Sequence, residues 1–220
     1  MTTIFVTSSG TDIGKTYVSA MLIRQLRSKG LPVQALKPIV SGVDDVTFSA
    51  SDPAALLAAL GEDVTFDNVD LVSRWVFEPA LSPDMAAARS GVEIDFKELV
   101  DHCKARMSLH DPLVIEGVGG LLVPLNTEKT VLDWMLALKG ENFVPLLVVG
   151  SYLGTISHTL TTLDVMQRNG LAPRAIIVSE SLSNPVPLAE TVEVMSRFTG
   201  ATPVIPVPRD GEADLAGLFI

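Results

Sequence analysis

Apolar and polar residues alternate along the chain with two different periods. Residues 4–7 form a short β-branched and apolar run, and residues 15–29 carry apolar side chains at helical spacing before Gly30. The same reading predicts strands at residues 33–36, 113–115, 144–149, 175–178 and 204–205, and helices at residues 54–60, 96–109, 131–138, 155–168 and 187–198. Strands that are apolar throughout indicate a parallel sheet covered on both faces. We therefore predict an α/β fold, with one three-layer, doubly wound domain over residues 1–220.

Polar residues and glycines gather where the predicted strands end. They occupy residues 7–16, 37–41, 116–120, 150–157 and 179–180. In open parallel sheets, ligands bind beyond the carboxyl ends of the strands. These five segments are therefore the expected walls of a binding site.

Composition excludes several classes of protein. The chain has 220 residues, 47% of them hydrophobic, so a disordered protein is excluded. A formal net charge of −10 argues against a general electrostatic grip on nucleic acid or on an anionic membrane. The single cysteine, Cys103, is expected to be a half-buried helix residue in a reducing compartment. No secretory signal and no apolar run of ~20 residues is visible, so we expect a cytoplasmic protein.

The segment at residues 7–16 reads TSSGTDIGKT and ends in Gly14-Lys15-Thr16 at a predicted helix start. Unpaired backbone N–H groups and the helix dipole favour an anion there. Lys15 would bring charge to the β- and γ-phosphates of a nucleotide, and Thr16 would offer a hydroxyl to Mg²⁺. The alternative is an ordinary turn with a solvated lysine. The position between a strand and a helix favours a phosphate loop, and hence a P-loop NTPase-like fold.

The usual phosphate-loop pattern requires a glycine where Ser9 stands. Because Ser8, Ser9 and Gly10 are all small, the backbone can still approach a phosphate closely.

Four further polar residues lie at predicted strand ends or in the segments that follow them. Lys37 could balance charge on a transferring phosphoryl group, and Ser41 follows it on the same loop and could hydrogen-bond a substrate. Glu116 ends an apolar strand, where a carboxylate suits Mg²⁺. Asp52 precedes Pro53, so its spacing fits a helix N-cap as well as a metal ligand.

Taken together, these motifs resemble the dethiobiotin synthetase family. The resemblance rests on the first loop, Lys37-Pro38, Ser41-Gly42, Ser51-Asp52 and the run EGVGG at residues 116–120, in this order along essentially the whole chain. The family's variant loop, typically G-T-D-T-x-V-G-K-T, places its first glycine at Ser8 of this chain. Val118 stands where the family usually has alanine, and Ser157 where it often has asparagine.

The resemblance implies a homodimeric ATP- and Mg²⁺-dependent ligase. Its substrates would be 7,8-diaminopelargonate and CO₂, joined through a carbamate and a carbamic–phosphoric anhydride into the cyclic urea dethiobiotin. Lys37 and Lys15 would be catalytic, and Thr16, Asp52 and Glu116 would hold Mg²⁺. The ATP-binding residues would be Thr11, Asp12, Ile13, Gly14, Lys15, Thr16, Tyr17, Asp52, Glu116, Gly117, Val118, Gly119, Ser179, Pro206, Val207 and Pro208. The substrate would meet Thr11 and Ser41, and its carboxylate tail would meet Leu153, Gly154, Thr155, Ile156 and Ser157 of the second subunit.

Two other functions compete with this interpretation. An amidoligase or cobyrinate-type synthetase usually carries a glutaminase domain, for which 220 residues leave no room. A partitioning or septum-placing ATPase usually has an additional lysine early in the loop and a basic amphipathic tail. Residues 8–13 hold no lysine, and residues 210–220 are acidic and apolar.

The base-binding position generates a first prediction. The family's adenine-contacting Asn-Asp is Ser179-Glu180 in this chain, and serine lacks the paired donor and acceptor of an amide. We expect looser discrimination between ATP and other triphosphates than in a Ser179→Asn variant. A competition assay with mixed nucleotides measures this, and equal discrimination by the two proteins would contradict it.

Overall fold

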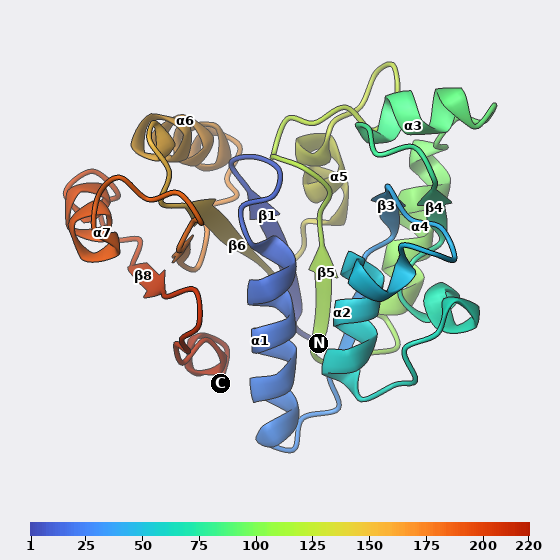
Figure 1. Cartoon of the computed structure of the whole chain (residues 1–220), viewed down its shortest axis with the longest axis horizontal. Helices are drawn as coiled ribbons and strands as arrows, with labels where there is room; N and C mark the ends of the chain where they lie inside the picture. Colours follow the sequence, from blue (N-terminus) through green and yellow to red (C-terminus); the bar gives the residue numbers. More distant parts are fainter.

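The central feature of the fold is a six-stranded sheet. The computed structural model describes residues 1–220, and its strand order is β2-β5-β1-β6-β7-β8 with every neighbouring pair parallel. The strands are β1 (Thr3–Ser8), β2 (Gln34–Leu36), β5 (Leu113–Glu116), β6 (Phe143–Gly150), β7 (Ile176–Ser179) and β8 (Val204–Val207). All of them point the same way, so their carboxyl ends share one edge of the sheet (Figure 1).

Helices cover both faces of this sheet, which confirms the predicted fold class. Helices α1 (Lys15–Ser28) and α2 (Asp52–Leu60) lie side by side against one face (Figure 1). The other face is covered by α3 (Pro83–Arg89), α4 (Phe96–Met107), α5 (Val131–Leu138), α6 (Thr155–Arg168) and α7 (Leu188–Ser196). Short 3₁₀ helices at Phe48–Ala50, Phe66–Leu71 and Ala216–Leu218 complete the chain.

Successive side chains of a strand point to opposite faces of the sheet, so each strand contributes to two hydrophobic cores. In β1, Ile4 and Val6 face the core beneath α1, whereas Phe5 faces the opposite core and meets the Trp134 ring edge-on. All three β1 residues are fully buried. Because the sheet is buried on both faces, its strands read as continuous apolar runs rather than alternating ones.

Local capping fixes several helix starts. Ser51 accepts a hydrogen bond from the backbone of Ala54 and so begins α2. Thr130 and Asp133 form a reciprocal capping box at the start of α5. Asp52 is therefore the first residue inside α2 and not its cap, which leaves its carboxylate available to the site.

The sequence pattern missed a second, two-stranded sheet. Strands β3 (Ile39–Ser41) and β4 (Trp75–Phe77) pair in parallel beside α2 and α4 (Figure 1). Each has only three residues, which is too short for a period to be recognised. Ser41 consequently ends a strand instead of lying on the same loop as Lys37.

The sequence pattern also missed helix α3, and the remaining differences are small. Predicted ends differ from observed ends by one to two residues for most elements, as fraying termini lead one to expect. Cys103 is fully buried and not half-buried, and burial raises the pKa of its thiol to about 12. None of the helices is long and apolar enough to cross a bilayer. The division of the chain into one domain stays a prediction.

Candidate active site

The loop between β1 and α1 is built for close contact with an anion. Gly14 has a left-handed backbone, φ 94°, and precedes the first residue of α1. A Cβ added to Gly14 would lie 2.3 Å from Ser179 Oγ, so only glycine fits. The first N–H groups of α1 have no partner within the helix and face the loop. The expected phosphate loop thus has the required backbone.

Ser8 ties this loop to its neighbours. Its buried hydroxyl lies 2.6 Å from the carbonyl oxygen of Gly10 and 2.8 Å from that of Gly119, and accepts a hydrogen bond from Lys15 Nζ at 3.1 Å. Lys15 Nζ also donates to the Gly10 carbonyl at 3.3 Å. The serine in place of the family glycine therefore holds Lys15 against the loop.

A second lysine, Lys37, lies in a buried charge cluster. Its Nζ is 2.7 Å from Glu116 Oε1, 2.9 Å from Asp52 Oδ2 and 2.9 Å from the carbonyl oxygen of Gly117. The side chains of Lys37 and Glu116 are almost fully buried, whereas that of Asp52 is 40% exposed. The structure thus brings together residues from β5, α2 and the end of β2.

The backbone of Lys37 is fixed as firmly as its side chain. Its N–H donates to the carbonyl of Val72 at 2.8 Å, and its carbonyl accepts from the Ser73 hydroxyl at 2.8 Å. Sequence reasoning missed both residues, because a serine and a valine in a turn carry no motif.

Thr16 links the loop to the two carboxylates. Its hydroxyl is 2.7 Å from Asp52 Oδ1 and 2.7 Å from Glu116 Oε1. A hydroxyl has one hydrogen, so it can donate to only one of these oxygens at a time. The open choice for Asp52 is settled against the capping role, since Ser51 caps α2 and Asp52 faces Lys37 and Thr16.

Charge and burial set the protonation of the cluster. Burial would lower the pKa of Lys37, but the carboxylates of Glu116 and Asp52 outweigh burial and hold it above its usual value. Burial would raise the pKa of Asp52, but the Lys37 ammonium holds it below its usual value. Burial, followed by repulsion from Lys37, lowers the pKa of Lys15 to about 8. Lys37 therefore stays charged, while Lys15 is poorly compensated without a bound anion.

The donor set fits a magnesium ion. Mg²⁺ takes one or two carboxylates and completes its shell with waters and phosphate oxygens. Glu116 Oε2 is buried and has no hydrogen-bond partner, which a native protein rarely tolerates without a ligand. Thr16, Asp52 and Glu116 can supply a hydroxyl and two carboxylates. No group of three or more His, Cys, Asp or Glu residues could hold another metal.

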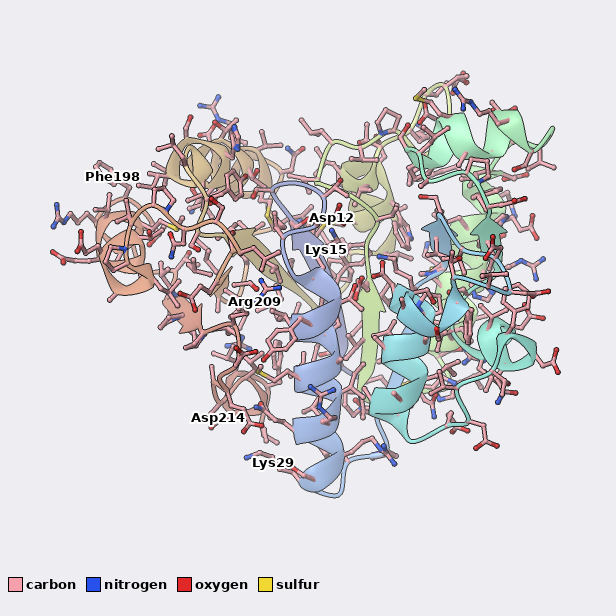
Figure 2. The ribbon with its side chains drawn as sticks, in the orientation of Figure 1. Asp12, Lys15, Lys29, Phe198, Arg209 and Asp214 are labelled. Atoms are coloured by element: carbon pink, nitrogen blue, oxygen red, sulfur yellow. The ribbon has the colours of Figure 1, made fainter.

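Two adjoining cavities extend along the loop. The first, of about 320 Å³, contains most of the expected phosphate and substrate residues. Its lining is Thr11, Asp12, Ile13, Gly14, Lys15, Thr16, Tyr17, Lys37, Val40, Ser41, Asp52, Val118 and Gly119. Figure 2 shows Asp12 and Lys15 at the loop end of α1, far from Lys29 at its other end.

The second cavity, of about 470 Å³, shares the residues from Asp12 to Gly14 and Tyr17 with the first. Ser179 lines it, as expected, together with Glu180. Pro206, Val207 and Pro208 do not line it, and their assignment as ATP contacts stays a prediction. The next two residues, Arg209 and Asp210, line it instead.

The pairing at the end of the sheet explains which of these residues line the cavity. Val207 is buried, and its carbonyl accepts from the Glu180 backbone at 3.0 Å. Glu180 Oε2 accepts from the Arg209 backbone at 3.0 Å, which turns the following residues toward the cavity.

The expected tail-binding segment, Leu153 to Ser157, lies elsewhere. It starts α6 and lines a separate cavity of about 740 Å³ between α6 and α7. The structure does not bring it to Ser41 and Lys37 within one chain. A role across a subunit boundary stays a prediction.

Comparisons with known proteins agree with this geometry. A family model described as an AAA domain matches residues 2–214. The chain is 44% identical to the ATP-dependent dethiobiotin synthetase BioD of Methylobacterium nodulans, over all of this chain and 99% of that one. It is 43% identical to the protein of the same name from Acidiphilium cryptum, over 92% of this chain and 91% of the relative.

Solved structures show the fold alone. The cell division ATPase MinD of Pyrococcus furiosus matches with a TM-score of 0.56 at 18% identity, over 96% of this chain and 84% of that one. A ParA family ATPase from Chlorobium tepidum matches with a TM-score of 0.57 at 14% identity, over 95% and 85%. Identities this low carry no statement about activity.

The pKa of Lys15 predicts a stability cost of the site. The pKa falls from 10.5 to about 8 on folding, so the protonated lysine destabilises the fold below pH 8. This cost fades as the pH rises from 8 to 10.5. Lys15→Met should therefore stabilise the free protein at pH 7 by roughly 3 kcal/mol, because each pKa unit between 10.5 and about 8 corresponds to about 1.4 kcal/mol. The gain should shrink toward pH 10, and nucleotide affinity should be lost.

Urea denaturation at pH 7 and at pH 9.5 measures the change in the free energy of unfolding. Lys29→Met is the matched control, because Lys29 is exposed at the far end of α1 (Figure 2). A Lys15→Met variant that is less stable than the wild type at pH 7 would contradict the account.

Proposed function

Because the chain belongs to the dethiobiotin synthetase family, and so is a ligase that uses ATP to make dethiobiotin in biotin biosynthesis, we propose how its residues carry out the reaction. Residues 1–220 act as one ligase domain on 7,8-diaminopelargonate, CO₂ and ATP. The observation that carries the proposal is the meeting of two lysines, two carboxylates and Thr16 at one edge of the sheet. Fold alone would not carry it, because one fold serves many functions.

The reaction has three steps. One amine of the diamine adds to CO₂ and loses a proton, which gives a carbamate. A carbamate oxygen attacks the γ-phosphorus of ATP, and ADP leaves. The second amine then attacks the carbamate carbon, loses a proton and expels phosphate, so that a cyclic urea forms.

Bringing two anions together is the main barrier, and the two lysines lower it. The α1 N-terminus and Lys15 bind the phosphates, while Lys37 balances the negative charge between carbamate and γ-phosphate. Thr11 and Ser41 orient the substrate in the same cavity. Thr16, Asp52 and Glu116 would hold Mg²⁺, which when bound neutralises phosphate charge.

Two subunits complete the substrate site. The helix start at Leu153–Ser157 offers unpaired backbone N–H groups, which suit the carboxylate tail of the substrate. Within one chain this segment lines a cavity separate from that of Ser41, which is compatible with delivery by a partner in a homodimer.

A partitioning ATPase is the alternative that the solved structures raise. Those proteins share the fold at identities below 20%. Residues 8–13 hold no additional lysine, and the sequence relatives at 43–44% identity are synthetases. The ligase is therefore favoured.

One assay tests the proposal. Protein, Mg²⁺, ATP, bicarbonate and 7,8-diaminopelargonate are mixed, and dethiobiotin and phosphate are measured. We expect both products in equal amounts, and ATP turnover that depends on the diamine. ATP hydrolysis without dethiobiotin would refute the proposed reaction.

Lys37→Ala tests the role of this lysine. We expect kcat to fall at least about a hundredfold, because charge stabilisation in the transition state is lost, while nucleotide still binds through the loop. Steady-state kinetics and calorimetric titration with ATP separate the two effects. A thermal melt verifies folding, since a buried carboxylate loses its partner. Near-normal turnover would show that Lys37 does not have this role.

A further inference from the structure

The ammonium of Lys37 is surrounded by three oxygens of its own chain. It donates to Glu116 Oε1 at 2.7 Å and to the Gly117 carbonyl at 2.9 Å, and it forms an ion pair with Asp52 Oδ2 at 2.9 Å. Its side chain is only 3% exposed. In the free protein the Lys37 ammonium is therefore held by Glu116, Asp52 and the Gly117 carbonyl.

The oxygens that hold Lys37 belong to the residues assigned to the metal. Asp52 and Glu116 each place one oxygen on the ammonium and one within 2.7 Å of the Thr16 hydroxyl, and for Glu116 it is the same oxygen. Only Glu116 Oε2 is left without a partner. A divalent cation that used both carboxylates would have to compete with the ammonium for them.

Charge balance sharpens this competition. The site holds two carboxylates, Asp52 and Glu116, and two ammonium groups, of which Lys37 contacts the carboxylates and Lys15 contacts the loop, so its formal net charge is zero. A divalent cation added alone would leave an excess of two positive charges in a largely buried site, where charge repulsion is strong. A nucleotide brings its own negative charge and removes this obstacle.

We propose that Lys37 is the placeholder for the divalent cation in the nucleotide-free protein. It excludes the free metal from Asp52 and Glu116, so metal enters together with nucleotide. With metal and nucleotide bound, the Lys37 ammonium would be free to reach the reacting phosphate. This inference rests on the metal assignment of the proposed function and adds an order of binding to it.

Binding of Mn²⁺ without nucleotide, followed by electron paramagnetic resonance, tests the placeholder directly. The wild type should bind Mn²⁺ weakly. Lys37→Met should bind it at least about tenfold more tightly, because the competing charge is gone. Asp52→Asn added to Lys37→Met should abolish the gain, and Lys29→Met should behave as wild type.

Lys37→Gln is a second variant for the same test, in case Lys37→Met does not fold. Glutamine keeps two donors for the carboxylates but removes the charge, so it too should bind Mn²⁺ more tightly than wild type. Wild-type affinity equal to that of both variants would overturn the proposal. The Mn²⁺ titration requires no turnover. If the wild-type protein made no dethiobiotin, the proposed function would be refuted, but the Mn²⁺ affinities would still decide whether Lys37 is the placeholder.

Discussion

The buried contact of Lys37 with Glu116 and Asp52 is the interaction around which the site is organised. An ion pair this deeply buried contributes little net stability, because desolvation offsets most of the attraction, yet removing one partner is costly. Glu116 ends strand β5, and Lys37 follows the neighbouring edge strand β2. The same contact therefore constrains the sheet edge, keeps the lysine charged and holds the carboxylates in position for a metal.

The parallel sheet makes this contact possible. Strand β5 lies between β2 and β1, and all three strands end at the same edge of the sheet. The phosphate loop, Lys37 and Glu116 follow or end these strands, so the parallel sheet alone brings them close together. The buried charge of Lys15 lowers the stability of the folded protein as long as no anion is bound beside it. Such local conflicts are typical of functional sites. A bound nucleotide would therefore relieve an unfavourable charge that the free protein carries at Lys15.

Sequence patterns predicted most of the fold and much of the site, for identifiable reasons. Buried parallel strands and long amphipathic helices have strong periods, and Gly14-Lys15-Thr16 has a motif. Strands β3 and β4 are too short to show a period, so the true setting of Ser41 could not be predicted. The choice between cap and ligand for Asp52 depended on which neighbour caps α2. The position of Arg209 beside the second cavity depends on a backbone contact with Glu180, which no spacing reveals.

The central claim is that Lys37 and the metal share one pair of carboxylates in succession. A crystal structure with Mg²⁺ and a non-hydrolysable ATP analogue tests it most directly. The account predicts that Lys37 Nζ moves beyond hydrogen-bond distance of at least one of Glu116 Oε1 and Asp52 Oδ2, now 2.7 and 2.9 Å away, and approaches the γ-phosphate. Both contacts intact, with metal bound to the nucleotide and not to Asp52 or Glu116, would contradict it.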